Sequence, residues 1–330
     1  MGTQKIDQIN PRVSVVIPTR NRPKLVLRAL QSVLAQTLRD IEVIVVVDGP
    51  DEITSRALNE IVDSRLRVEV LPTHLGFSII RNAGVSVARG DWVAFLDDDD
   101  EWLPDKLHLQ LSTAKHSRFS KPIIACRVVA RSEYGERVLP LRFPAENEPL
   151  SEYLLCQNSL LPGEGLVIPS AILASKELLL QIPYNRNVGL YDGTDWVLRA
   201  SMLEGVGIEF PMQIDPLVIW HVEEDRIRMS RSARWHESLT WAQSNRYLFT
   251  SRSYAALMLT WVSALAARRY DWKAFMALML EAYHYGKPSA IDLILHFAIW
   301  FVPIRVRRWV NLLFGRPNHM RPLKPNGVNQ

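Results

Sequence analysis

Residues 92–100 read WVAFLDDDD, an apolar run that ends in four adjacent aspartates. The run is short and rich in bulky apolar residues, which predicts a buried β-strand with the aspartates at its carboxyl end. Four neighbouring carboxylates repel one another, so burying them without a countercharge is costly. A divalent cation that prefers oxygen ligands, Mg²⁺ or Mn²⁺, supplies such a charge. The alternative is a solvated acidic turn that caps the helix predicted near 103–115.

Strand and helix signals alternate on the amino-terminal side of this run. Apolar strands are predicted at 13–17, 41–47 and 66–71, and helices near 23–34, 52–61 and 78–88. This alternation implies crossover connections and a mostly parallel sheet with helices on both faces. Ligands of such sheets bind beyond the carboxyl ends of the strands. The residues at these ends are Pro18, Thr19, Arg20, Asn21, Asp48, Gly49 and the aspartates 97–100.

The composition is that of a globular protein with one large or two modest domains. The 330 residues are 48% hydrophobic and 22% charged, with 15 Gly and 2 Cys, which excludes disordered, collagen-like and disulfide-rich chains. Cys126 and Cys156 lack metal-binding spacing, so we expect buried thiols in a reducing compartment. We expect neither a secretory signal nor a spanning helix, and therefore a cytoplasmic protein.

The formal net charge of +4 is unevenly distributed. Residues 251–330 hold 11 Lys and Arg against 3 Asp and Glu, whereas residues 1–250 hold 28 against 32. Such a basic tail indicates an anionic partner, either a membrane or a nucleic acid. Residues 303–314 would form a basic amphipathic helix with Trp309 on its apolar face, which is typical of an anionic bilayer interface. The alternatives are a helix packed on the protein, and nucleic acid, which we do not expect because no binding module appears.

A series of stretches resembles family 2 glycosyltransferases of the GT-A fold. They are VSVVIPTRNR at 13–22, SVLAQT at 32–37, EVIVVVDG at 42–49, Gly76, RNAG at 81–84, ARGDW at 88–92 and FLDDDDEWLPDKL at 95–107. The resemblance covers about 12–107, is looser over 150–221, and supports nothing beyond about 235.

This resemblance implies an α/β protein of the GT-A fold with a mostly parallel central sheet, followed here by a C-terminal helical extension. Residues 1–130 would be the nucleotide-sugar-binding half and residues 131–235 the acceptor-binding half with the catalytic base. Residues 236–330, broken by Pro288 and Pro303, would form a helical, basic extension. The implied activity is metal-assisted, inverting transfer of a sugar from a nucleotide donor, which we expect to be UDP-linked. The acceptor would be a hydroxyl of a glycan, a lipid-linked molecule or a small molecule.

The resemblance also implies roles for the strand-end residues. Thr19 with Arg20 matches the lining of the base pocket, flanked by Pro18 and Asn21, and Asp48 matches the carboxylate that accepts from the base. The family's Asp-Asp-Gly-Ser is here Val-Asp-Gly-Pro at 47–50, so one carboxylate of that motif is missing.

Two further motif positions face the leaving group in the family. Arg81 matches an arginine near the diphosphate, where a guanidinium fork suits phosphate oxygens. Asp97, Asp98 and Asp99 fall on the DXD motif, with Asp99 as the first candidate metal ligand and Asp97 or Asp98 meeting metal or ribose. Arg81 could instead be a surface arginine of its helix.

Inverting transfer requires a carboxylate that takes the proton of the acceptor hydroxyl. Family members place it at a helix start about 100 residues after the metal motif, and Asp195 follows Asp99 by 96 positions. Asp195 is therefore the expected base, and Asp192 is the alternative, unless it serves only as a helix cap. His221, 26 positions after Asp195, is a candidate third metal ligand, although a lone histidine is more often structural. The arginine-rich segment 223–234 is either a lid or a solvated loop.

Two other functions stay open at this point. A sugar-phosphate nucleotidyltransferase usually has a glycine-rich phosphate loop after its first strand, and residues 18–22 are not one. A catalytically inactive GT-A-like binding or scaffold protein at the membrane would not need Asp99 and Asp195. The resulting expectation is a cytoplasmic enzyme that associates peripherally with the inner face of the cell membrane through its C-terminal helices.

Overall fold

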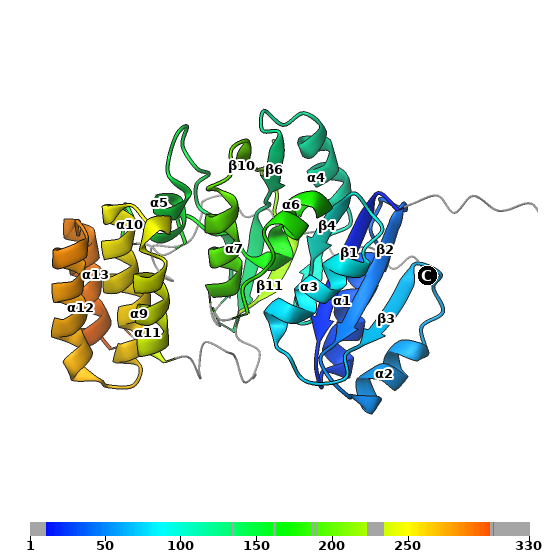
Figure 1. Ribbon diagram of the computed structural model, residues 1–330, viewed down its shortest axis with the longest axis horizontal. Coiled ribbons are helices and arrows are strands. Elements are labelled where there is room, and N and C mark those ends of the chain that lie inside the picture. Colours follow the sequence, from blue (N-terminus) through cyan, green and yellow to red (C-terminus); the bar gives the residue numbers. More distant parts are fainter. Residues whose placement is uncertain are drawn as a thin grey trace, which may run out of the picture.

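A computed structural model describes residues 11–133, 135–160, 163–186, 188, 191–222, 234–303 and 306. These residues form a central sheet, a second, smaller sheet and a group of C-terminal helices at the end of the molecule opposite β3 (Figure 1). The predicted GT-A class, with a mostly parallel central sheet and a C-terminal helical extension, is confirmed.

The central sheet has the strand order β10-β6-β9-β4-β1-β2-β3. The strand β9 is antiparallel to both of its neighbours, and the other pairs are parallel. The apolar runs predicted from the sequence are β4, β1 and β2 in its middle and β3 at one edge. The strands are β1 (Val13–Thr19), β2 (Ile41–Val47), β3 (Leu66–Val70), β4 (Trp92–Phe95), β6 (Lys121–Ile124), β9 (Leu173–Ser175) and β10 (Val206–Glu209).

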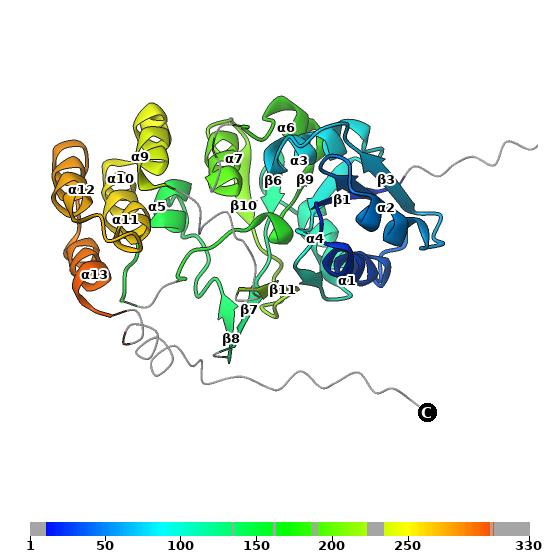
Figure 2. The same cartoon turned by 90° about the horizontal axis from the view of Figure 1, so that it is seen from below.

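Helices cover both faces of this sheet (Figure 2). Successive residues of a strand point to opposite faces, so Val43 and Val45 pack in one apolar cluster, whereas Ile44 and Val46 pack in the other. Gly84 permits a close approach of helix and sheet, because a Cβ there would lie 2.4 Å from Val16. On the first face lie α1 (Pro23–Leu34), α2 (Glu52–Asn59) and α4 (Lys106–Lys115); on the second lie α3 (Phe77–Val87), α6 (Lys176–Gln181) and α7 (Asp192–Ala200).

The second sheet lies beside the carboxyl end of β4 and has the order β5-β11-β7-β8. Its β5 directly follows the four aspartates and pairs with β11, so that Ile219 lies opposite Glu101. A short 3-10 helix, Pro169–Ala171, precedes β9, and α5 is Leu150–Leu155. The strands are β5 (Glu101–Trp102), β7 (Val128–Ser132), β8 (Gly135–Leu139) and β11 (Val218–His221).

The C-terminal helices share one apolar cluster with α7 and the sheet. Trp241 of α9 stacks on Tyr191, which precedes α7, with ring centroids 4.7 Å apart. Within the described ranges, no helix is both long and apolar enough to cross a bilayer. The boundaries predicted at 130 and 235 stay predictions. The helices are α9 (Trp235–Ser244), α10 (Ser251–Ala256), a π-helical segment (Leu257–Val262), α11 (Ser263–Ala267), α12 (Trp272–Tyr285) and α13 (Ala290–Phe301), with a 3-10 turn at Arg246–Leu248.

Candidate active site

The carboxyl ends of β1, β2 and β4 meet at one edge of the central sheet. The register pairs Thr19 with Val47 across β1 and β2, and Val16 with Phe95 across β1 and β4. The hydroxyl of Thr19 donates to Asp98 at 2.8 Å, although the two residues are 79 positions apart in sequence. The strand ends predicted to lie together therefore do so, and we call residues 18–22, 48 and 97–101 the strand-end rim.

Asp98 is the buried carboxylate of this rim. It accepts hydrogen bonds from Thr19 and, at 3.0 Å, from Nη1 of Arg22. Burial raises the pKa of Asp98 to about 6, against the attraction of Arg22 and together with the repulsion from Asp99. A carboxylate held in this way fixes Thr19 and Arg22 at the edge of the sheet.

Asp100 is also buried, but its contacts are structural. It accepts from the hydroxyl of Ser170 at 2.6 Å and from the backbone N–H of His221 at 3.2 Å. Burial, and then the charges of Asp99 and Asp97, raise its pKa well above the usual range. Asp100 thus joins the rim to the 3-10 helix and to the second sheet.

Asp97 and Asp99 are the accessible members, with side chains 28% and 25% exposed. Asp97 pairs with Nη2 of Arg81 at 2.6 Å, and Asp99 lies 3.4 Å from Nη1 of Arg22. Among the residues that the structure describes, no three His, Cys, Asp or Glu side chains already converge as a ligand set. Magnesium typically takes one or two carboxylates together with substrate phosphates, so the donor chemistry of Asp97 and Asp99 fits Mg²⁺ or Mn²⁺.

His221 lies beside this cluster, as its strand-end position predicts. Its Nε2 is 2.7 Å from Oε1 of Glu101, and Glu101 is 3.5 Å from Nε of Arg28. The imidazole therefore contacts the acidic segment through Glu101 in this arrangement. Its role as a metal ligand stays a prediction.

Arg81 bridges the rim and α7. It is buried, with Nη2 on Asp97 and Nη1 on Asp192. Burial lowers the pKa of Arg81, but the carboxylates of Asp192 and Asp97 outweigh that effect and leave the pKa raised. Its Nε is buried without a hydrogen-bond partner in the described part of the chain. Arg81 is thus a fixed cation beside the acidic cluster, and its contact with a diphosphate stays a prediction.

The two aspartates of α7 have different surroundings. Asp192 lies next to Arg81 and accepts from the backbone N–H of Gly193 at 2.7 Å. Burial raises the pKa of Asp192 despite the nearby Arg81. Asp195, the base expected from the sequence, is fully buried, with Oδ2 2.7 Å from Nε of Arg199 and Oδ1 3.1 Å from Nε1 of Trp241. Of the two, Asp192 is the one joined to the rim through Arg81.

Asp48 is buried at the end of β2 and holds the loop before α3. It accepts from the backbone N–H of Leu75 at 2.7 Å and of Gly76 at 3.1 Å, and it pairs with Nδ1 of His74. The imidazole of His74 is 54% exposed. The predicted contact of Asp48 with a nucleotide base therefore stays a prediction.

The remaining base-pocket candidates lie at the end of β1. Pro18 is buried, and Arg20 is exposed. Asn21 has a φ of 52°, and its backbone N–H donates to Asp51 at 2.6 Å. This left-handed residue turns the chain from β1 into α1 and leaves the side chains of Arg20 and Asn21 at the surface of the rim.

Sequence reasoning missed four contributors to this cluster: Arg22, Arg28, His74 and Ser170. Charge balance could have found two of them, because four adjacent aspartates need nearby cations. Arg22 and Arg28 are the nearest cations that α1 can direct at the rim. No comparable signal in the sequence identifies His74 or Ser170.

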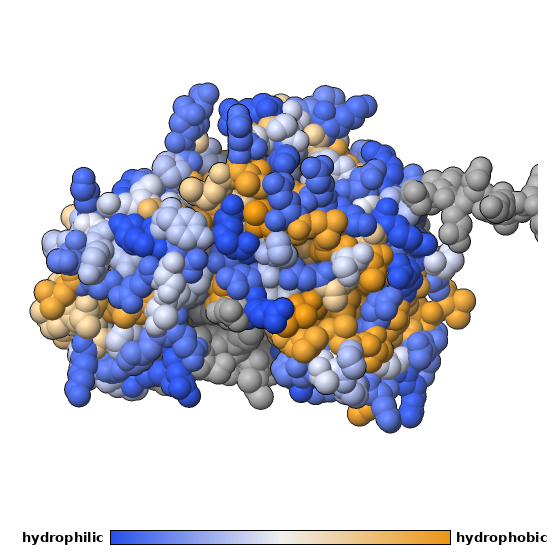
Figure 3. Space-filling view, viewed as in Figure 1, coloured by the Kyte–Doolittle hydropathy of each residue, from blue (hydrophilic) through white to orange (hydrophobic). Residues whose placement is uncertain are grey.

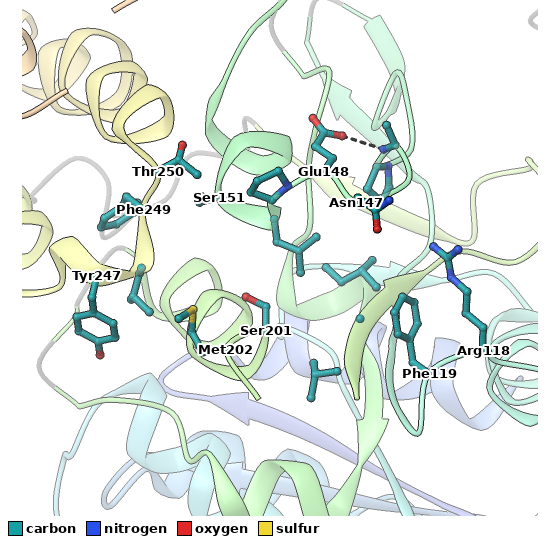
Figure 4. A pocket seen from close by; sticks show the side chains of 18 residues that line it. Arg118, Phe119, Asn147, Glu148, Ser151, Ser201, Met202, Tyr247, Phe249 and Thr250 are labelled. Carbon is teal, nitrogen blue, oxygen red and sulfur yellow. Dashed lines mark hydrogen bonds between the residues drawn. The ribbon is translucent and has the colours of Figure 1, made fainter. Parts of the chain in front are cut away.

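A cavity of about 620 Å³ lies away from the rim, between β10, the end of α7 and the segment before α10 (Figure 4). None of the predicted site residues lines it. Labelled residues around it include Arg118, Phe119, Asn147, Met202 and Tyr247.

Two predicted segments fall mostly outside the described residues. Of the arginine-rich segment 223–234 only Arg234 is described, and of the amphipathic segment 303–314 only Pro303 and Val306 are described. The lid and the amphipathic helix stay predictions.

Comparison with known proteins identifies the family. The model of Glycosyl transferase family 2 matches residues 14–182, which contain the rim and its supporting strands. The chain belongs to glycosyltransferase family 2, as the sequence motifs predict.

Relatives and solved structures agree with this assignment. The amylovoran biosynthesis glycosyltransferase AmsB of Erwinia amylovora is 29% identical over 220 residues, 63% of this chain and 69% of AmsB. The succinoglycan biosynthesis protein ExoO of Rhizobium meliloti is 37% identical over 114 residues, 34% of this chain, and the match spans only 32% of ExoO. The mannosyltransferase PcManGT of Pyrobaculum calidifontis has the same fold, with a TM-score of 0.58 at 16% identity, over 93% of this chain and 85% of PcManGT.

Proposed function

We propose that this glycosyltransferase moves a sugar from a nucleotide donor to a hydroxyl of a growing polysaccharide or of its lipid-linked precursor. The observation that carries the proposal is the chain of contacts from Thr19 through Asp98 and Arg22 at the rim, and from Asp97 through Arg81 to Asp192 on α7. The names of AmsB and ExoO support the acceptor class, since both refer to polysaccharide biosynthesis.

The donor would lie across the strand-end rim. Arg22 and Arg81 are the cations beside the acidic cluster, and the partnerless Nε of Arg81 is a donor suited to a phosphate oxygen. Arg20 and Asn21, with Asp48 behind His74, would line the base. We propose UDP as the nucleotide of the donor. PcManGT was solved with GDP-Man and Mn²⁺, so GDP is the alternative. A panel of donors distinguishes the two nucleotides.

Asp99 and Asp97 would hold Mn²⁺ or Mg²⁺, and His221, next to Glu101, would be the further ligand. The PcManGT complex with Mn²⁺ supports a divalent cation at this kind of site. When bound, such an ion offsets the negative charge that develops on the leaving diphosphate.

The acceptor chemistry requires a base near this site. The acceptor oxygen forms a bond to the anomeric carbon of the sugar while the bond from that carbon to the diphosphate oxygen breaks, with inversion. The hydroxyl proton passes to a carboxylate of α7, and the geometry favours Asp192 because it lies beside Arg81 and has a raised pKa. Asp195, which is fully buried and hydrogen-bonded to Arg199 and to Trp241 of α9, would then position α7.

The test is donor turnover by the purified full-length chain. UDP-, GDP-, dTDP- and CMP-linked sugars are incubated with Mn²⁺ and with EDTA, and release of the nucleotide is measured. We expect turnover of one nucleotide class, its loss in EDTA, and a loss of about a thousandfold in Asp99→Ala. The matched control is Asp40→Ala, an exposed aspartate at the amino end of β2, on the opposite edge of the sheet. If no donor binds or turns over, the proposed function is wrong.

We also propose a peripheral location on the inner face of the cell membrane, where a lipid-linked acceptor would be available. The excess of basic residues in 251–330 supports it.

A further inference from the structure

Helices α12 and α13 present large apolar side chains to solvent. On α12 these recur at helical spacing, and on α13 three more lie on the adjoining face. The rings of Trp272 and Phe301 lie 5.8 Å apart, and those of Phe297 and Phe301 lie 6.0 Å apart, so the two helices form one continuous surface. We call this surface the α12–α13 face; its exposed residues are Trp272, Met276, Leu280, Tyr283, Ile294, Phe297 and Phe301.

These exposed residues are distinct from the residues with which the two helices pack against the rest of the protein. Both helices also bury a separate set of residues, including Ala274, Leu278 and Trp300, against α10, α11 and the π-helical segment. Trp272 is 52% and Phe301 60% exposed, and hydrophobic residues appear at this end of the molecule in the surface view (Figure 3). Contiguous apolar patches of this kind mark an interaction surface.

Charge identifies the kind of surface that fits. Arg268, Arg269 and Lys273 are all exposed where the chain enters α12, beside Trp272. Tyr270 lies between Arg269 and Lys273 in the sequence and is 80% exposed. Its φ of 55° is a strained conformation for a bulky residue, and no burial of its side chain compensates for that strain.

The acidic residues of the same helices each have a hydrogen-bond partner within the protein. Asp271 accepts from Trp235, Glu281 from Tyr254, and the carboxylate of Asp292 from Ser289 at the start of α13. The outer surface therefore combines apolar side chains, interfacial aromatics and cations, while the carboxylates of these helices are hydrogen-bonded to other groups of the protein.

We propose that the α12–α13 face inserts into the headgroup region of an anionic lipid bilayer, with Arg268, Arg269 and Lys273 at the phosphates. Aromatic side chains at the boundary and cations beside them are the combination that an anionic membrane interface favours. This inference names the surface for the membrane location proposed above and rests on that part of the proposed function. It concerns described helices, not the segment 303–314 in which the sequence predicts an amphipathic helix.

The test is flotation of the full-length chain with two kinds of vesicle, phosphatidylcholine alone and an equimolar mixture with phosphatidylglycerol. We expect binding to the mixed vesicles that weakens at high salt. The triple variant Trp272→Ser/Phe297→Ser/Phe301→Ser should bind at least about tenfold more weakly, because each ring loses its contact with the lipid. Lys273→Glu should weaken binding about fivefold or more.

Matched controls come from the other half of the molecule. The triple variant Ile53→Ser/Met212→Ser/Ile214→Ser removes apolar side chains that are even more exposed, and Lys115→Glu reverses an exposed lysine of α4. Both controls should float as the wild type does. Turnover of the nucleotide sugar without vesicles should be unchanged in all variants, so failure of the membrane proposal and failure of the proposed activity are separate results.

Three outcomes would overturn the proposal. The first is flotation of the α12–α13 triple variant at the wild-type level. The second is a wild-type dimer that does not float and that this variant dissociates, which would make a second copy the occupant. The third is flotation that appears only when residues 307–330 are deleted, which would mean that the chain's own tail covers the face.

Discussion

The strand-end rim and the α12–α13 face differ in where their charged and apolar side chains lie. At the rim, carboxylates are drawn together and partly buried, and arginines from α1 and α3 counter them. On the α12–α13 face, the carboxylates are hydrogen-bonded to other groups of the protein and apolar side chains stay in solvent. Each region departs from the usual arrangement of a folded protein, and each departure costs stability. This difference supports the two proposals made above, a charged ligand at the rim and an apolar partner at the face.

The largest effect on transfer should distinguish the two aspartates of α7, Asp192 and Asp195. Asp192→Asn removes the carboxylate that touches Arg81, so we expect a loss of about a hundredfold to ten-thousandfold in acceptor-dependent transfer, with the fold retained. Asp195→Asn should retain most of the transfer and lower the free energy of unfolding by about 1–3 kcal/mol, because a buried charge beside Arg199 is lost. Initial rates and urea unfolding of both variants give the comparison.

The opposite pattern would support the assignment of Asp195 as the base, which the sequence spacing predicts. If Asp195→Asn lost transfer while its stability stayed at the wild-type level, Asp195 would be the base and Asp192 a partner of Arg81. Asp215→Asn, at an exposed aspartate before β11, is the matched control and should change neither quantity.

The sequence predicts the rim well and its side-chain contacts poorly. Thr19 and Asp98 could be expected at one edge because both follow apolar runs that parallel pairing aligns. Which aspartate of α7 faces the rim could not be predicted, because the choice depends on Trp241, 46 positions after Asp195. Spacing along a helix carries no information about so distant a partner.

The α12–α13 face was missed for a related reason. Both helices are apolar around most of their circumference, so periodicity does not distinguish the buried side from the exposed one. The sequence instead draws attention to 303–314, where arginines make the polar side visible. A three-dimensional arrangement is needed to show that Leu278 is covered and Leu280 is not.

An effect of intermediate size is expected from a buried lysine beneath the rim. Lys106 donates to Gln110 at 2.7 Å and lies 3.8 Å from the ring centre of Trp102, and no carboxylate pairs with it among the described side chains. Burial lowers its pKa from 10.5 to about 8, and Cys126 is the titratable group beside it. We expect Lys106→Met to raise the free energy of unfolding at pH 7 by about 1–3 kcal/mol.

The sign of the pH dependence follows from the lowered pKa. Above about pH 8 the folded protein releases the Lys106 proton while the unfolded chain still holds it, so the wild type gains stability as the pH rises toward 10.5. In urea unfolding from pH 7 to 9, the free energy of unfolding of the wild type should therefore approach that of Lys106→Met. The thiol of Cys126 acts in the opposite direction, because burial raises its folded pKa to about 11 and the unfolded thiol ionises first as the pH approaches 9. Both proteins carry this thiol, so the comparison uses the difference between their two stability curves. A constant difference between the free energies of unfolding of the two proteins across this pH range would contradict the prediction.

The smallest effect should come from the α12–α13 face itself, measured without lipid. Phe301→Ser should change the free energy of unfolding by less than about 1 kcal/mol, because the ring is already 60% exposed and contributes little to the core. Phe95→Ala, at a fully buried ring just before the aspartates, should cost about 3–5 kcal/mol. Urea unfolding of both variants provides the comparison. A loss in Phe301→Ser as large as in Phe95→Ala would mean that the face is packed in solution, and the contrast between the two regions would then be wrong.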